Sequence, residues 1–143
     1  MTELLVRPAT PLDLPAITAI QAASPEAARW NPAQYLDYDT RVAIAQDQVV
    51  AFLVLRQTAP GEREILNLAV DPGHRRQGIG RRLLMEVLAG PGTGPRSDWF
   101  LEVRESNRAA VGLYRGLGFV PSGFRPAYYA DPPESGIVMK RAS

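Results

Sequence analysis

The sequence contains no cysteine, one histidine (His74) and one lysine (Lys140). The absence of cysteine excludes disulfides, thiolate zinc sites, iron–sulfur ligation and a cysteine nucleophile. A single histidine also argues against a histidine-based metal site. We therefore expect no metal cofactor.

Long apolar runs and an excess of either charge are also missing. No stretch approaches the ~20 apolar residues of a membrane span, and residues 1–7 hold no basic segment followed by a long apolar run. The formal net charge of +1 gives no overall basic field of the kind used for non-specific binding to nucleic acids or membrane surfaces. We expect a cytoplasmic protein without nucleic-acid or membrane partners, and either a monomer or a homodimer.

The composition is that of one folded domain. The chain has 143 residues, 45% of them hydrophobic, with 12 Gly and 13 Pro. This length and apolar content are typical of a single domain with its own core, and they exclude global disorder. We expect residues 1–143 to form one domain.

Hydrophobic periodicity predicts antiparallel strands in the first half of the sequence. The polar Gln46-Asp47-Gln48 between two β-rich runs is a hairpin signal, and Pro11 suits the first turn of a helix. Residues 24–40 show no clean period, so we expect short helices and loops there, with no role assigned. The expected elements are an edge strand at 4–6, a helix at 11–23 and strands at 41–45, 49–55 and 64–70.

The second half alternates strands and helices. The expected elements are a helix at 79–89, a strand at 99–103, a helix at 110–117 closed by Gly118, and strands at 119–124 and 137–139. Antiparallel strands followed by strand–helix–strand–helix–strand predict an α+β fold. Its sheet is mixed but mostly antiparallel, with helices on both faces.

The loop at residues 70–80 has the features of an anion site. It joins a strand to a helix, whose first N–H groups lack intrahelical partners and favour an anion. Gly78 and Gly80 remove side chains where a diphosphate would approach the backbone, and Arg75 or Arg76 can clamp phosphate oxygens. The loop lacks the Gly-Lys-Ser/Thr of a P-loop and does not open the chain as a Rossmann turn does. The alternative is a helix N-terminus that merely contains Arg and Gly.

Glu102 interrupts the otherwise apolar strand at 99–103. A buried carboxylate is unfavourable unless it is paired or used, and a carboxylate in such surroundings is a candidate general base. The alternative is a strand-end salt bridge, with Arg104 or Arg108 as the partner. The residues alone leave both interpretations open.

The loop sequence RRQGIG at 75–80 resembles the Arg/Gln-x-x-Gly-x-Gly/Ala signature of the GNAT family of N-acetyltransferases. Further segments are similar to the ribosomal-protein-alanine N-acetyltransferase branch, the RimI type. They are NLAVDP at 67–72, LEVRESN at 101–107, Ala110, Leu113-Tyr114, Leu117-Gly118-Phe119 and RPAYY at 125–129. The resemblance covers roughly residues 49–140. It implies the GNAT (acyl-CoA N-acyltransferase) fold.

The resemblance also implies acetyl-CoA as the acetyl donor. In this family the strand ending near residue 70 splays from the next strand, and the pantetheine arm inserts between them. Asn107 would hydrogen-bond that arm, and it is also a candidate N-cap of its helix. The implied cofactor-binding residues are Leu68, Ala69 and Val70 for pantetheine, and Arg75, Arg76, Gln77, Gly78, Ile79 and Gly80 for the pyrophosphate.

For catalysis, the resemblance implies Glu102 as general base and Tyr114 as the general acid that protonates the departing thiolate. From its helical spacing alone, a tyrosine at position 114 is more often a core residue than a catalytic one. Trp30, Tyr128 and Tyr129 are candidate walls of the substrate cleft, the last two on a loop before the final strand.

The acceptor implied by the RimI-type segments is a protein N-terminal α-amine, as on a ribosomal protein. Deprotonating an α-amine of pKa ~7.7–8.0 at pH 7 costs about 1 kcal/mol, against nearer 5 for a lysine at ~10.4. The sequence departs from the RimI-type branch in two places. Residues 90–95 shorten the central helix, and residues 24–40 match the branch weakly. The alternatives are an acetyltransferase for a small amine such as a polyamine or antibiotic, favoured by a cleft rich in acidic residues, and a non-catalytic acetyl-CoA sensor.

Overall fold

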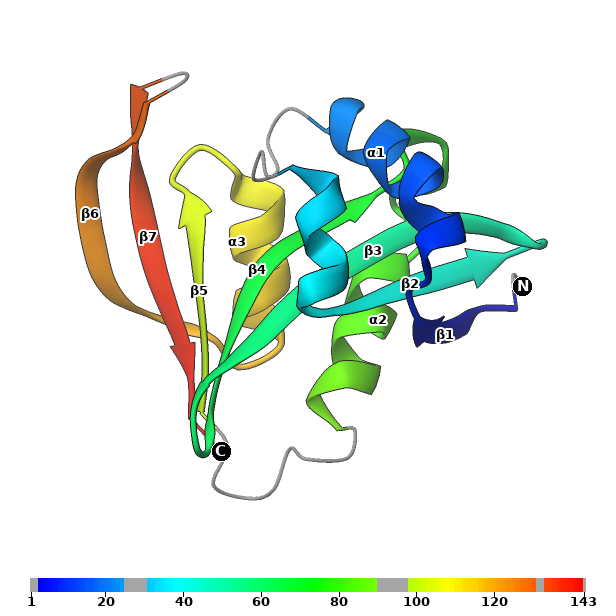
Figure 1. Cartoon of the computed structure of the whole chain (residues 1–143). Helices are drawn as coiled ribbons and strands as arrows, with labels where there is room; N and C mark the ends of the chain where they lie inside the picture. The colour runs from blue at the N-terminus through cyan, green and yellow to red at the C-terminus, as the bar shows by residue number, and fades with distance from the viewer. Residues whose placement is uncertain (1–2, 25–30, 90–97, 131–132, 143) are drawn as a thin grey trace. The chain divides into compact units, whose positions relative to one another are not determined.

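The computed structural model describes residues 3–24, 31–89, 98–130 and 133–142 (Figure 1). The chain divides into two compact units, residues 1–56 with 66–90, and residues 57–65 with 91–143. Each unit is described by itself. That the whole chain is one domain stays a prediction.

The first unit contains the strands and helices that begin the chain. They are β1 (Leu5–Pro8), the 3-10 helix η1 (Pro11–Asp13), α1 (Leu14–Ala22), η2 (Pro32–Asp37), β2 (Asp39–Ala45), most of β3 (Gln48–Ala59), the end of β4 (Glu62–Val70), η3 (Pro72–His74) and α2 (Ile79–Leu88). β1 pairs antiparallel with β2, and β2 with β3. Gln46 and Asp47, between β2 and β3, both have positive φ (52° and 62°), as a two-residue hairpin turn requires. The predicted hairpin and edge strand are therefore confirmed.

The core of the first unit forms where α1 and η2 meet the sheet. Its buried residues are Ile17, Ile20, Tyr35, Val42, Phe52, Val54 and Ala69. Tyr35, from η2, is fully buried, and its ring lies 5.6 Å from that of Phe52. The segment that had no assigned role thus supplies a central core side chain.

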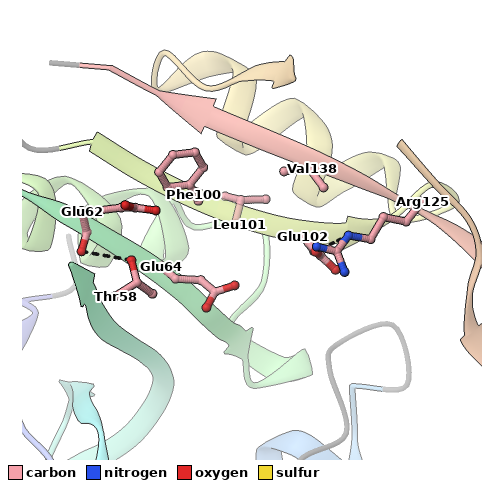
Figure 2. Close-up of a pocket in the computed structure, with 8 residues that line it drawn as sticks. All are labelled: Thr58, Glu62, Glu64, Phe100, Leu101, Glu102, Arg125 and Val138. Atoms are coloured by element: carbon pink, nitrogen blue, oxygen red, sulfur yellow. Dashed lines mark hydrogen bonds and ion pairs between the residues drawn. The ribbon is translucent and has the colours of Figure 1, made fainter. Parts of the chain in front are cut away.

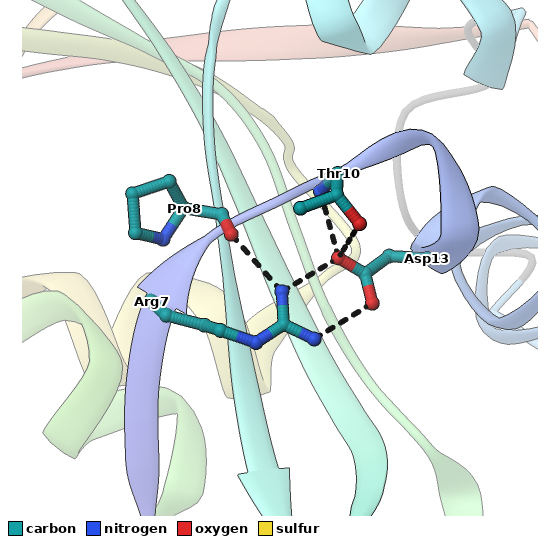
Figure 3. A network of polar contacts seen from close by, with 4 residues as sticks. All are labelled: Arg7, Pro8, Thr10 and Asp13. Atoms are coloured by element: carbon teal, nitrogen blue, oxygen red, sulfur yellow. Dashed lines mark hydrogen bonds and ion pairs between the residues drawn. The ribbon is translucent and has the colours of Figure 1, made fainter.

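Arg7 and Asp13 join β1 to the start of α1 (Figure 3). The Arg7 guanidinium donates to both Asp13 carboxylate oxygens, at 2.7 and 2.9 Å, and the Thr10 N–H donates to the same carboxylate at 2.8 Å. Asp13 is 5% exposed. The hydrogen bonds from Arg7 hold the pKa of Asp13 below its usual value in spite of this burial.

The second unit contains the tip of the β3–β4 hairpin, β5 (Asp98–Arg104), α3 (Arg108–Gly116), β6 (Val120–Ala130) and β7 (Pro133–Arg141). β4 pairs parallel with β5 from Glu62↔Asp98 to Ile65↔Leu101, β5 pairs antiparallel with β7, and β7 with β6. The strand order in the sheet is β1-β2-β3-β4-β5-β7-β6. The predicted mixed, mostly antiparallel sheet is confirmed.

β6 is longer than the sequence predicts. It continues beyond Phe124 to Ala130 as an edge strand, with a register irregularity between Arg125 and Tyr129. An edge strand accommodates Pro126 because the missing N–H is not needed for an interior ladder. The placement of Tyr128 and Tyr129 on a loop is therefore wrong, since both lie on β6.

Candidate functional site

The loop between β4 and α2 places exposed backbone ahead of a helix. After η3, Arg76 has φ +63° and Gly78, the residue before α2, has φ +75°, both left-handed conformations. The side chain of His74 contacts Asp71, with 2.9 Å between Nδ1 and Oδ2. Arg75, Arg76, Gln77 and Gly78 are exposed, whereas Ile79 and Gly80 are buried.

The N-terminus of α2 has no side-chain cap. The Arg82 N–H makes the first intrahelical bond, to the Gly78 carbonyl at 3.0 Å. The N–H groups of residues 79–81 therefore precede the intrahelical ladder and have the partial positive charge of a helix N-terminus. This end of α2 suits a phosphate group, as the sequence predicts.

The two arginines of the loop differ in their contacts. The Arg75 guanidinium donates to the Val70 carbonyl at 3.3 Å and to the Ser24 hydroxyl at 3.1 Å, and Ser24 is buried at the end of α1. Arg75 thus braces the loop against β4 and the end of α1. Arg76 extends from the exposed part of the loop.

Asn67 is a buried polar residue that the sequence analysis did not single out. Its Nδ2 donates to the Tyr35 hydroxyl at 2.9 Å and to Oε1 of Gln21 at 3.2 Å, and its Oδ1 accepts from the Leu68 N–H at 3.0 Å. The Tyr35 hydroxyl also donates to Gln21. Because Ile65, Asn67 and Ala69 alternate on the buried face of β4, a period-two reading of the strand would have found this residue.

The three β4 residues predicted to bind the cofactor follow the same alternation of buried and half-buried side chains. Ala69 is buried in the core of the first unit, while Leu68 and Val70 are half-buried. The next residue, Asp71, donates its N–H to the Val50 carbonyl at 2.8 Å.

In the second unit, Glu102 lines a pocket of about 190 Å³ (Figure 2). Its carboxylate Oε1 lies 3.0 Å from Nε of Arg125, and its side chain is 18% exposed. The pocket residues are Thr58, Glu62, Glu64, Phe100, Leu101, Glu102, Arg125 and Val138. Three carboxylates and one guanidinium therefore face a single pocket.

The predicted salt-bridge partners of Glu102 are wrong. Arg125 reaches it from β6, whereas Arg104 pairs with Glu134 at 3.4 Å. Glu102 and Arg104 lie on the same face of β5, two residues apart, but the Arg104 guanidinium meets the Glu134 carboxylate of the neighbouring strand β7. Glu134 also accepts hydrogen bonds from Ser106, which lower the pKa of the Glu134 carboxyl below its usual value.

The helix α3 carries the other two predicted residues of this unit. Asn107 caps it, with Oδ1 accepting from the Ala110 N–H at 3.2 Å. Tyr114 is 6% exposed, and its ring meets that of Phe119 edge-on at 5.6 Å. Both structural interpretations made from the sequence are thus present in the structure, and neither excludes a role in binding or catalysis.

Three predicted substrate contacts lie outside the described part of the structure. They are Trp30 and the side chains of Tyr128 and Tyr129. Among the described residues, no three His, Asp or Glu side chains are grouped so as to hold a metal ion. No helix in the described ranges is long and apolar enough to cross a membrane.

Comparison with known proteins identifies the family. The family model described as "Acetyltransferase (GNAT) family" matches residues 10–119. The chain belongs to the GNAT family. The predicted family and its acetyltransferase fold are therefore confirmed.

Curated relatives fall in the branch that the sequence resembles. This GNAT chain is 35% identical to the Escherichia coli ribosomal protein bS18-alanine N-acetyltransferase over 108 residues, 74% of this chain and 70% of that protein. It is 42% identical to the N-alpha-acetyltransferase RimI of Mycobacterium tuberculosis over 89 residues, 62% of this chain and 54% of that protein. An uncharacterised Mycobacterium leprae protein is 44% identical over 87 residues, 61% of this chain but only 23% of its own length.

Solved structures share the GNAT fold over nearly the whole chain. The crystal structure of the E. coli ribosomal-protein-alanine N-acetyltransferase covers 98% of this chain and 94% of its own, with a TM-score of 0.83 and 29% identity. A GNAT acetyltransferase from Elizabethkingia anophelis, solved with acetyl-CoA bound, covers 98% of both chains with a TM-score of 0.79. At 21% identity the second likeness concerns the fold alone.

Proposed function

We propose that this protein transfers the acetyl group of acetyl-CoA to the α-amine at the N-terminus of a protein. The observation that carries the proposal is the Glu102 carboxylate lining a pocket in a chain whose relatives are N-terminal acetyltransferases. A ribosomal protein is the acceptor class that the name of the E. coli relative suggests.

The loop before α2 is the proposed cofactor loop. The N–H groups at the start of α2 and the positive-φ backbone at Gly78 fit a diphosphate, which approaches such a loop closely only where side chains are absent. Arg76 supplies positive charge from the exposed side of the loop, and Arg75 holds the loop in place. Gln77, Ile79 and Gly80 contribute backbone, as do Leu68, Ala69 and Val70 toward the pantetheine amides.

When bound, acetyl-CoA supplies the activated acyl group as a thioester. Glu102 accepts the proton that the acceptor ammonium must lose before its nitrogen can form the new C–N bond. Tyr114 donates a hydrogen bond or a proton to the sulfur as the C–S bond breaks. Asn107 caps α3 and hydrogen-bonds the pantetheine arm.

The charges of the pocket favour one second candidate. Glu62, Glu64 and Glu102 outnumber the single guanidinium of Arg125, and an acidic cleft is the feature that favours a polyamine acceptor. The second candidate is therefore acetyl transfer to a small polyamine.

One acetylation assay separates the candidates. N-terminal peptides with an unblocked α-amine, the same peptides with a blocked α-amine and an internal lysine, and free spermidine are compared at equal concentration. The proposal expects the unblocked peptides to react fastest. Faster acetylation of spermidine or lysine than of every N-terminal peptide would replace it, and acetyl-CoA binding without turnover of any amine would identify a sensor.

The proposed base has a direct test with a matched control. Glu102→Gln keeps the side-chain size but removes basicity, so kcat/KM falls by the ~10²–10⁴ of a general base and recovers in part at high pH as the amine deprotonates unaided. Glu105→Gln changes an exposed glutamate three residues further on and leaves kcat/KM unchanged. A Glu102→Gln profile that follows the wild type at full height would show that Glu102 is not the base.

A further inference from the structure

The ion pair between Arg125 and Glu102 spans an intervening strand. Glu102 on β5 pairs with Val138 of β7, and Arg125 on β6 pairs with Gly136 of the same strand. The guanidinium therefore crosses β7, a distance of about two strand spacings, or ~10 Å between the outer backbones. Gly136 has no side chain to obstruct the arginine stem, and Val138 lines the pocket beside it.

This pair contributes little to stability. The Arg125 side chain is 55% exposed, and ion pairs of such exposure are typically worth about 0–1 kcal/mol. Its geometric effect is larger, because Nε of Arg125 holds Oε1 of Glu102 at 3.0 Å and so restricts the orientation of the carboxylate (Figure 2). The second carboxylate oxygen is then turned in a defined direction.

We propose that Arg125 is a positioning residue for the general base of this enzyme. It fixes the Glu102 carboxylate so that one oxygen is held by the guanidinium and the other accepts the proton from the acceptor amine. The inference rests on the proposed function of Glu102, and it adds a residue from the edge strand β6 that acts through that carboxylate. Misplacing a reacting group by about 1 Å costs up to 10²-fold in rate, so we expect a loss of about 10-fold when the constraint is removed.

A double-mutant cycle in the full-length protein tests the inference. Arg125→Gln is expected to lower kcat/KM for the best acceptor about 10-fold and to leave KM for acetyl-CoA unchanged. In the Glu102→Gln background the same change is expected to cost less than 2-fold, because the carboxylate on which Arg125 acts is gone. Arg125→Lys, which keeps the charge, restores part of the loss. Arg115→Gln, an exposed arginine on α3, is the control.

A spectroscopic measurement makes the test independent of the acceptor. The carboxyl carbon-13 resonance of Glu102 is assigned in labelled wild type by its disappearance in Glu102→Gln, and it is expected to shift in Arg125→Gln at pH 7 but not in Arg115→Gln. An unshifted resonance overturns the inference even if no acceptor is found.

The remaining outcomes separate this inference from the proposed function. Equal losses from Arg125→Gln in both backgrounds would mean that Arg125 contacts the acceptor directly, which overturns the inference and leaves N-terminal acetylation intact. If spermidine is the better substrate, the proposed acceptor is wrong, and the cycle measured with spermidine still decides the role of Arg125. A collapsed cycle together with a shifted resonance supports the inference in either case.

Discussion

Substitution of Gly78 tests the proposed cofactor loop at its most constrained residue. A Cβ added there meets no atom within 4 Å, so an alanine would not clash. The φ of +75° is nevertheless a left-handed conformation, which costs an L-residue about 1–2 kcal/mol. The lower entropy of the unfolded chain offsets about 0.4–1 kcal/mol of this. Gly78→Ala should therefore lower the free energy of unfolding by roughly 1 kcal/mol, or about 3 °C in Tm for a domain of this size.

Gly112 is the matched control for this change. It lies within α3, and a Cβ there also meets no atom within 4 Å. Gly112→Ala should raise the stability by about 0.5–1 kcal/mol, because alanine is the better helix former. Thermal denaturation of both variants measures the difference. A Tm that rises equally in the two proteins would show that the Gly78 backbone is not held in the left-handed conformation.

Cofactor binding adds a second measurement at the same residue. Calorimetric titration with CoA should show a larger loss of affinity for Gly78→Val than for Arg75→Gln or Arg76→Gln. The reason is that a β-branched side chain both strains this backbone and covers the N–H groups at the start of α2. Folded Gly78→Val that binds CoA like the wild type would rule out pyrophosphate binding at this loop.

Three further changes have defined outcomes. Tyr114→Phe removes the hydroxyl but keeps the ring that packs on Phe119, so kcat should fall while the affinity for acetyl-CoA stays near wild type. High pH should not restore kcat, and an unchanged kcat would remove Tyr114 from the mechanism. Asn107→Ala should cost about 1 kcal/mol through loss of the N-cap, measured by urea denaturation, with Asn107→Asp as the conservative variant that retains the cap. Asp13→Asn should destabilise the protein by about 1–3 kcal/mol at pH 7. The folded pKa of Asp13 lies below its unfolded value, so this stabilisation is complete above about pH 4 and is lost as the pH falls through the folded pKa. If the variant and the wild type differed in stability by the same amount at pH 7 and at pH 3, the lowered pKa of Asp13 would be contradicted.

Local signals in the sequence predicted most of the elements. The hairpin at Gln46-Asp47 follows from two polar residues that adopt positive φ between β-rich runs, and α2 follows from its apolar periodicity. The cap at Asn107 is also a local feature. The loop at 75–80 was identified by its glycines and arginines together with the resemblance to the family.

Contacts between strands were the part that could not be predicted. Arg125 pairs with Glu102 because β7 lies between β5 and β6, and this strand order is not encoded in any short stretch of sequence. The length of β6 was missed for a related reason, because Pro126 terminates an interior strand but not an edge strand. A sequence pattern specifies periodicity, whereas register and edge position depend on the whole sheet.

The hydrogen bonds among Asn67, Tyr35 and Gln21 set a practical rule for building chimeras of this protein. These three residues come from β4, η2 and α1, yet they satisfy one another's buried polar atoms. A graft of residues 31–40 that has no tyrosine at position 35 loses the hydroxyl that accepts from Asn67 and donates to Gln21, at about 1 kcal/mol for each hydrogen bond lost. Grafts of this segment will therefore need either to keep Tyr35 or to exchange Gln21 and Asn67 together with it.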